Sequence, residues 1–163
     1  MPPTVQTASE VLAERLAPPT PLAYPATAVR LDDADLLPSL ASLRARQRIV
    51  IGVLRASAAP SAAVLAACDL VLAPDDRHPS TVGSDDVDAE AERVLAAIAR
   101  NPRAATVLAD VLRASASLPV VDALHVESLA YSALLAGSEF AAWLAGRPAR
   151  TAVVPDRPPV RVE

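Results

Sequence analysis

Two apolar segments, at residues 49–54 and 69–73, most constrain the fold of this chain. Their sequences are IVIGVL and DLVLA, and neither alternates apolar with polar residues. Strands of this kind are usually covered on both faces, as in a parallel sheet. The alanine-rich segment 60–67 between them is predicted to form a short helix that joins two parallel strands. The sequence therefore predicts a strand–helix–strand unit over residues 49–73.

A second unit of the same kind is expected upstream. Residues 28–31 read AVRL and predict a short strand, and residues 34–46 carry leucines at helical spacing. Two such units in succession indicate a small α/β layer with parallel strands. Residues 74–86 contain two prolines, a glycine and several polar residues, so they are predicted to form a loop.

The remainder of the chain is predicted to be helical. Residues 88–100 form an amphipathic pattern with an acidic first turn. Asn101 and Pro102 are expected to cap and open a second helix. Pro119 opens a third helix, and Ser138 is expected to cap a short fourth one. These patterns predict a C-terminal helical segment after the α/β layer.

The predicted domain covers residues 26–147, with its α/β part at 26–74 and its helices at 87–147. Residues 1–25 are rich in Pro, Thr and Ala and are expected to form a mobile arm. Residues 148–163 are rich in Pro and Arg and are expected to form a tail or a linker to a further module. The sequence thus predicts one domain between two irregular ends.

Composition excludes several classes of function. Hydrophobic residues make up 52% of the 163 residues and aromatic residues 2%, so the core consists mainly of small aliphatic side chains, which makes further burial in an oligomer favourable. The net charge of −4 and the scarcity of aromatics argue against nucleic-acid binding. We expect no membrane span, since no apolar run is long enough, and no signal peptide. The single cysteine, Cys68, fits a reducing compartment, so we expect a cytoplasmic protein.

Three segments, in their order along the chain, resemble the enoyl-CoA hydratase/isomerase (crotonase) superfamily. They are an A-C-D-L strand after a turn and helix, an I-A-x-N-P helix pair, and an E…L…S-E-F segment. The resemblance covers roughly residues 45–147. It implies a truncated crotonase-like spiral and a coenzyme A thioester as the ligand class. The matched positions are Ala67, Cys68, Asp69 and Leu70, then Ile98, Ala99, Asn101 and Pro102, then Glu127, Leu134 or Leu135, Ser138, Glu139 and Phe140.

The chain departs from this family where the family's chemistry takes place. Crotonases bind the thioester carbonyl through two backbone N–H groups, one of them in a glycine-rich turn. The corresponding turn here is Ala59, Pro60, Ser61 and Ala62, and the usual acidic residue falls on Ala63. Proline has no N–H to donate, and alanine is neither acid nor base. The segment that carries a second glutamate in hydratases is also missing, so we predict no catalytic residues of the family type.

Two polar groups of residues are candidate sites. One follows the strand at 69–73, where α/β sites commonly form, and it would be either a site or a solvated turn. The other is an acidic run, which would be either a cation site or a set of helix caps and dipole partners. The spacing of the two histidines favours no metal site. The first group comprises Asp75, Asp76, Arg77 and His78, and the second Asp85, Asp86, Asp88, Glu90 and Glu92.

Three further features have structural explanations. A histidine, an acid and a serine lie close together in the sequence, as in sites of nucleophilic catalysis; they are His125, Glu127 and Ser128. Neighbouring positions of a helix point in different directions, so these side chains are not expected to form a relay. Cys68 is expected to be a buried, inert thiol. Phe140 and Trp143 are expected to be packing anchors or an oligomer contact. None of these features predicts a catalytic group.

Three functions therefore remain open. The first is a catalytically degenerate crotonase-like module that assembles, through residues 119–147, with copies of itself, with a crotonase-like partner or with a downstream domain. The second is an active, shortened enoyl-CoA hydratase/isomerase that uses Asp75, Asp76 or His78. The third is an unrelated α/β interaction domain. We favour the first, with no catalytic residue and no metal.

Overall fold

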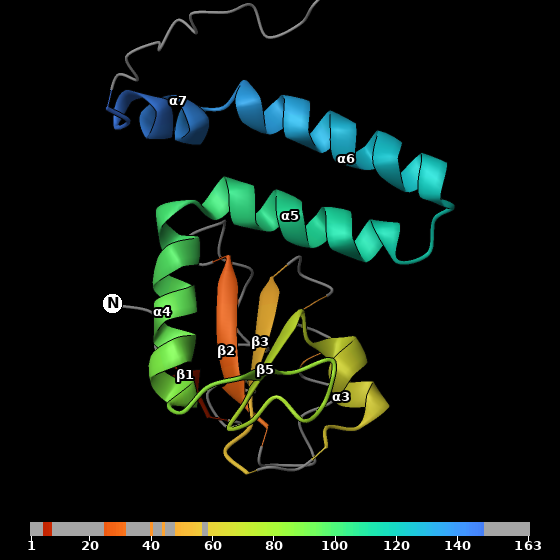
Figure 1. Ribbon diagram of the computed structural model, residues 1–163, viewed down its shortest axis with the longest axis vertical. Helices are drawn as coiled ribbons and strands as arrows, with labels where there is room; N and C mark the ends of the chain where they lie inside the picture. The colour runs from red at the N-terminus through yellow and green to blue at the C-terminus, as the bar shows by residue number, and fades with distance from the viewer. Residues whose placement is uncertain are drawn as a thin grey trace, which may run out of the picture.

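The computed structural model describes residues 5–7, 25–31, 40, 44, 48–56 and 59–148. Its centre is a five-stranded parallel sheet whose strands lie in chain order (Figure 1). The three longer strands are β2 (Ala26–Arg30), β3 (Ile49–Val53) and β4 (Leu70–Ala73). Two-residue strands extend the sheet at its edges, β1 (Val5–Gln6) beside β2 and β5 (Val82–Gly83) beside β4. The predicted parallel α/β layer is confirmed.

Helix α3 (Ala62–Ala67), which joins β3 to β4, packs on one face of the sheet. The fully buried Leu40, which lies between β2 and β3 in the chain, belongs to the same cluster. Val29, Val50 and Val71 point from the strands into this cluster. Parallel strands in chain order require crossovers on one face, because such connections are right-handed.

Helix α4 (Val87–Arg100) covers the other face of the sheet. Its buried residues Val87, Ala91 and Leu95 lie at helical spacing and pack against Ile51 and Leu72 of the strands. The sheet is therefore buried on both faces, which explains why its strands show no polar alternation.

Three further helices form an arm beyond the sheet, which we call the helical arm. It consists of α5 (Pro102–Ser115), α6 (Val120–Leu135) and α7 (Ser138–Ala145). Helix α5 crosses one end of the sheet, and α6 packs antiparallel against its outer side (Figure 1). No residue of these three helices is counted as buried. None of the helices in the described part of the chain has both the length and the apolar character needed to cross a membrane.

Several local predictions needed correction. Helix α3 begins at Ala62 and not at residue 60, because the Ser61 hydroxyl caps it by accepting the Val64 N–H. The predicted loop 74–86 contains β5, which the sequence did not indicate. Gly137, and not Ser138, is the residue before α7. Asn101 precedes α5 as expected, but its side chain makes no capping hydrogen bond.

Other predictions lie largely outside the described residues. In the expected arm 1–25, Val5–Gln6 forms β1, and only residues 5–7 and 25 are described. In the expected helix 34–46, only Leu40 and Arg44 are described, and both have helical backbone. The tail 149–163 is not described.

Candidate functional site

The turn that the resemblance aligns with the oxyanion hole is occupied by helix-capping contacts. Ser61 accepts the Val64 N–H at 3.3 Å, so its hydroxyl serves α3. Ala59 and Ala63 are exposed, and Pro60 has no N–H. Among the described residues of this turn, no side chain is an acid or a base.

The polar loop after β4 is held by contacts within itself. Arg77 pairs with Asp75 at 3.2 Å, and the His78 Nδ1 accepts the Ser80 N–H at 3.2 Å. The backbone of Asp75 and Asp76 lies against Gly83, where a Cβ would come within 2.8 Å of the Asp76 nitrogen. These contacts account for the loop as a tight polar turn.

The acidic run divides between helix capping and ion pairs. Asp86 caps α4 by accepting the Ala89 N–H at 2.9 Å. Asp88, in the first turn of α4, forms an ion pair with Arg55 after β3 and lies 3.7 Å from the Arg30 guanidinium at the end of β2. These contacts fasten α4 to the ends of two strands. The described residues contain no group of three or more His, Cys, Asp or Glu side chains that fits a metal ion.

Asp69 forms a covered ion pair at the opposite end of the sheet, where the strands begin. Its Oδ1 accepts from the Arg113 Nε at 2.8 Å, and its Oδ2 from the Arg113 Nη2 at 2.6 Å and from the Val50 N–H at 2.8 Å. The Arg113 and Asp69 side chains are only 17% and 13% exposed. Arg113 also donates to the Arg48 carbonyl at 2.7 Å. This bidentate pair fastens the end of α5 to the starts of β3 and β4.

The environment of Asp69 favours its ionised form. Burial alone would raise the pKa of the carboxyl group, but the hydrogen bonds from Arg113 and from the Val50 N–H outweigh it and lower the pKa below its usual value. The same ion pair raises the pKa of Arg113. Sequence reasoning noticed Asp69 only as part of a motif. A carboxylate at the edge of an otherwise apolar strand was the available signal, because such a group needs a partner.

Glu139, another acid of the matched motifs, caps a helix that is distant in sequence. Its two oxygens accept the N–H groups of Arg103 and Ala104 at 2.8 and 2.9 Å. The first N–H groups of a helix lack partners within it, and a carboxylate suits the positive end of the dipole. Glu139 therefore takes the role that we expected of Asn101, and it fastens α7 to the start of α5.

The residues considered for nucleophilic chemistry do not gather into a site. His125, Glu127 and Ser128 are all exposed positions of α6. At about 100° per residue, His125 and Glu127 project in directions about 160° apart. Cys68 is 7% exposed, and burial followed by the charge of Asp69 raises its pKa to about 11. Its thiol is therefore protonated at neutral pH.

The helical arm exposes apolar side chains on one of its faces. Helix α6 packs against α5 through four partly buried positions at helical spacing, Ala123, Val126, Ala130 and Leu134. Successive residues of a helix are about 100° apart, so several large apolar residues of α6 lie together on one side of the row that contacts α5. Two leucines of the antiparallel α5 lie on the same side of the helix pair. We call this surface the apolar face. It consists of Leu108, Leu112, Val120, Leu124, Tyr131 and Leu135, all exposed.

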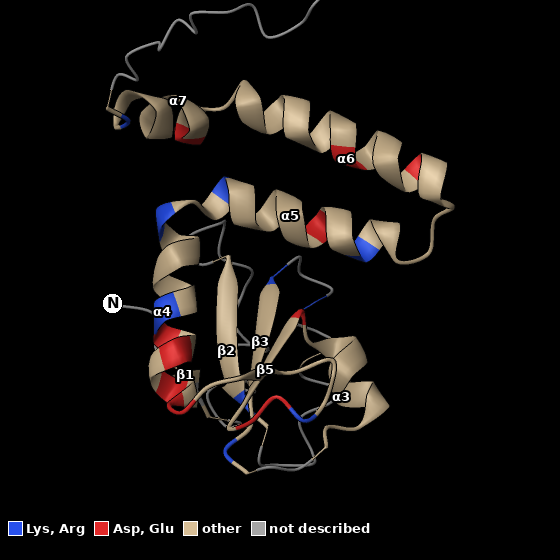
Figure 2. Cartoon of the chain, in the orientation of Figure 1, with Lys and Arg blue, Asp and Glu red and all other residues tan. Residues whose placement is uncertain are grey.

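The opposite face of the same two helices is mainly polar. The same helical geometry places Arg103 and Asp110 of α5 and Asp122 and His125 of α6 there, together with Leu129. Figure 2 shows how few charged residues α6 and α7 carry in comparison with α4. The arm is therefore a two-helix layer that is polar on one side and apolar on the other.

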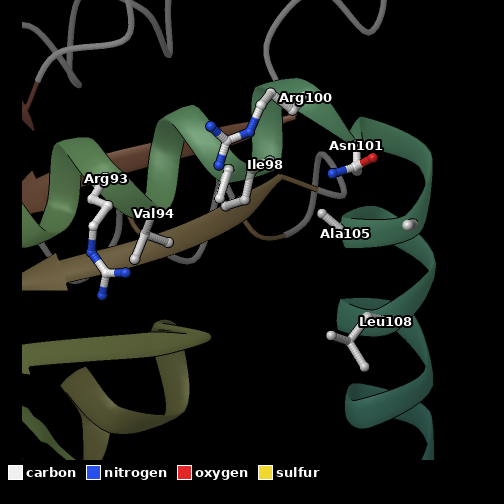
Figure 3. Close-up of a pocket in the computed structure, with 9 residues that line it drawn as sticks. Arg93, Val94, Ile98, Arg100, Asn101, Ala105 and Leu108 are labelled. Carbon is white, nitrogen blue, oxygen red and sulfur yellow. The ribbon is translucent and has the colours of Figure 1, made fainter. Parts of the chain in front are cut away.

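The apolar face continues into a groove between α4 and α5. The groove has a volume of about 370 Å³ and shares Leu108 with the apolar face. Val94, Ile98 and Ala105 line it, and Arg93 and Arg100 stand along α4 beside it (Figure 3). Arg93 is paired with Glu90. The groove thus extends the apolar surface toward the sheet.

Aromatic residues lie at the far end of the arm. Phe140 and Trp143 stack with their ring centroids 5.5 Å apart, and the Arg147 guanidinium lies 4.3 Å from the centroid of the Trp143 ring. Trp143 remains half exposed. The two rings therefore pack on each other and not into a core, since no residue of α7 is buried.

Comparisons with known proteins give no relative for this chain. It matches no family model, no curated protein and no solved structure. What the protein does must therefore be argued from its own residues.

Proposed function

We propose that this chain is a crotonase-like module without the family's acyl-CoA chemistry, and that it works by assembly through its helical arm. The observation that carries the proposal is the apolar face. Soluble monomers rarely expose contiguous apolar patches beyond about 300–600 Å², and patches of that size are often binding sites. Because one side of α6 exposes the large apolar residues Val120, Leu124, Tyr131 and Leu135, this side resembles a helix surface that is covered by other protein.

The way the arm is fastened supports this role. The Asp69–Arg113 ion pair holds one end of α5 to the sheet, and Glu139 holds α7 to its other end. One acid of the matched motifs thus holds α5 to the sheet, and another holds α7 to α5. A rigid surface binds with a smaller loss of conformational entropy, which suits an assembly element.

The crotonase part of the proposal rests on the motifs and their order. A spiral of strand–helix turns places successive parallel strands side by side, and the observed sheet has that order. The turn with Pro60 and Ala63 lacks the donor and the acid of the reaction. The alternative is an α/β interaction domain that is unrelated to the crotonase family. Such a domain would also use the apolar face for binding.

An assay with an enoyl-CoA thioester, such as crotonyl-CoA, tests the loss of chemistry. The full chain is expected to give no hydration or isomerisation above the buffer rate and no heat of binding. Measurable turnover would overturn the proposal and favour the shortened enzyme. In that case, replacing Asp75, Asp76 and His78 together with alanine should abolish the turnover.

The role of the arm is tested by a matched pair of variants. Leu124→Arg places a charge on the apolar face, whereas Leu129→Arg places the same charge on the opposite face of α6. Their parent side chains are 57% and 73% exposed, so neither change disturbs the core. Assembly should be lost only in the first variant, and equal behaviour of the two would contradict an assembly role for this face.

A further inference from the structure

We propose that the apolar face is covered by the same face of a second copy, with α6 lying antiparallel on α6 of that copy. The inference rests on the proposed function and names its partner. A two-fold interface brings the same patch of both subunits together, so residue i meets j and j meets i. The partner surface is therefore fully defined by the residues of this chain.

The size of the apolar face suits such a dimer. At about 150–200 Å² for a fully exposed large side chain, its six residues expose on the order of 600 Å². A standard interface buries about 800 Å² of each partner, of which the apolar part is the centre and the polar part the rim. A rim around the apolar face would supply the remainder.

The order of residues along α6 is self-complementary. The midpoint of the helix falls between Glu127 and Ser128, and apolar residues stand at equal distances on either side of it. An antiparallel copy centred there would bring Val120 opposite Leu135 and Leu124 opposite Tyr131. Each large apolar residue of one half thus meets one from the other half, and each pairing occurs twice. A parallel arrangement would instead pair each residue with itself.

One contact of this dimer would be unfavourable. Glu127 borders the apolar face beside the midpoint, so the two copies of its carboxylate lie near the two-fold axis. Repulsion between two like charges about 7 Å apart in water weakens the affinity of the dimer roughly twofold to threefold. Glu127→Gln is therefore expected to tighten the dimer by about that factor at low salt, and the gain should shrink as salt is added.

Disulfide cross-linking tests the antiparallel register. Two full-length variants, Leu124→Cys and Tyr131→Cys, are oxidised separately and as a mixture. In the proposed dimer the two positions 124 are about 10 Å apart along the helix, since seven residues rise about 1.5 Å each. That offset adds to the separation of the helices and exceeds the reach of a disulfide, about 4.4–6.8 Å between Cα atoms. Native Cys68 is buried and has a pKa raised to about 11, so it does not interfere.

We expect a cross-linked dimer from the mixture and none from either variant alone. Cross-linking of each variant with itself would overturn the antiparallel register, and no cross-link in any sample would overturn the second-copy interface. Leu124→Arg should raise the dissociation constant at least about 100-fold, while Leu129→Arg leaves it within about threefold. A monomeric chain that also lacks enoyl-CoA turnover would refute this inference and leave assembly with another partner. Turnover in a dimeric chain would refute the proposed function alone.

Discussion

The Asp69–Arg113 ion pair gives the sharpest prediction about stability. Replacing Asp69 with alanine leaves the Val50 N–H without its acceptor and Arg113 without its bidentate partner. Removing one partner of a buried pair costs about 3–5 kcal/mol. Arg113 keeps the Arg48 carbonyl and a contact with Asp110 at 3.3 Å, and both pair members retain some exposure. We therefore expect the variant to lose about 2–4 kcal/mol of unfolding free energy.

Chemical unfolding of the wild type, Asp69→Ala, Arg113→Met and the double variant measures this loss as a thermodynamic cycle. For a domain of this size, 1 kcal/mol corresponds to about 2–4 °C in Tm, so either single variant should melt roughly 5–15 °C lower. The double variant should be more stable than the sum of the two single losses implies, because it leaves neither charge unpaired. Single losses below about 1 kcal/mol that simply add would refute the argument.

An exposed ion pair serves as the matched control. Glu90 and Arg93 are three residues apart on α4, and the Arg93 side chain is 75% exposed. Arg93→Met should change the free energy of unfolding by less than about 0.5 kcal/mol, because water already solvates the Arg93 guanidinium. A loss equal to that of Arg113→Met would mean that burial does not decide the effect.

Further predictions concern four other properties of the fold. Because the pKa of Asp69 is lowered in the folded state, its ionised carboxylate contributes stability at pH values above its unfolded pKa of about 3.9. This contribution is lost as pH falls through the folded pKa, so the stability of Asp69→Asn should lack this part of the pH dependence in acid unfolding. A maleimide at pH 8 should label Cys68 on the order of 100-fold more slowly in the native than in the unfolded chain, and equal rates would contradict its burial. Glu139→Ala should cost about 1–2 kcal/mol and speed amide exchange at the start of α5, whereas unchanged exchange would exclude the cap. Gly83→Ala should cost about 1–3 kcal/mol by thermal melting, since its Cβ would meet the Asp76 backbone, and a neutral effect would contradict that approach.

The parts of the fold that sequence reasoning found are those with local signals. The strands at Ile49–Val53 and Leu70–Ala73 were visible as apolar runs, and α4 as an amphipathic pattern. The two-residue strands β1 and β5 carry no periodicity, and only their pairing with neighbouring strands makes them strands. Edge strands as short as these cannot be predicted from the local sequence alone.

The candidate site was harder to predict because its contacts are long-range. The cap of α5 comes from Glu139, 36 residues after Arg103, and the partner of Asp69 is 44 residues away. Nothing local to Asn101 or Asp69 specifies these contacts. The assembly contact expected of residues 119–147 stays a prediction, and the structure adds that α6 in this segment exposes large apolar side chains.

The proposed role of the apolar face agrees with the amino-acid composition of the chain. A chain with few aromatic residues and a core of small aliphatic side chains buries little area per residue. The large apolar residues of α6 are nevertheless placed outside the core. Covering them in an assembly would add the burial that the isolated domain lacks.

The mass of the full chain in solution tests the central claim most directly. Sedimentation equilibrium over a range of concentrations is expected to give a mass of twice 16.9 kDa, and Leu124→Arg is expected to give 16.9 kDa. The Leu129→Arg variant should behave like the wild type. A wild-type mass of 16.9 kDa at every concentration up to about 100 µM would contradict self-assembly. At that concentration even a dimer with a Kd of about 10 µM, or about 7 kcal/mol of binding free energy, would be the main species.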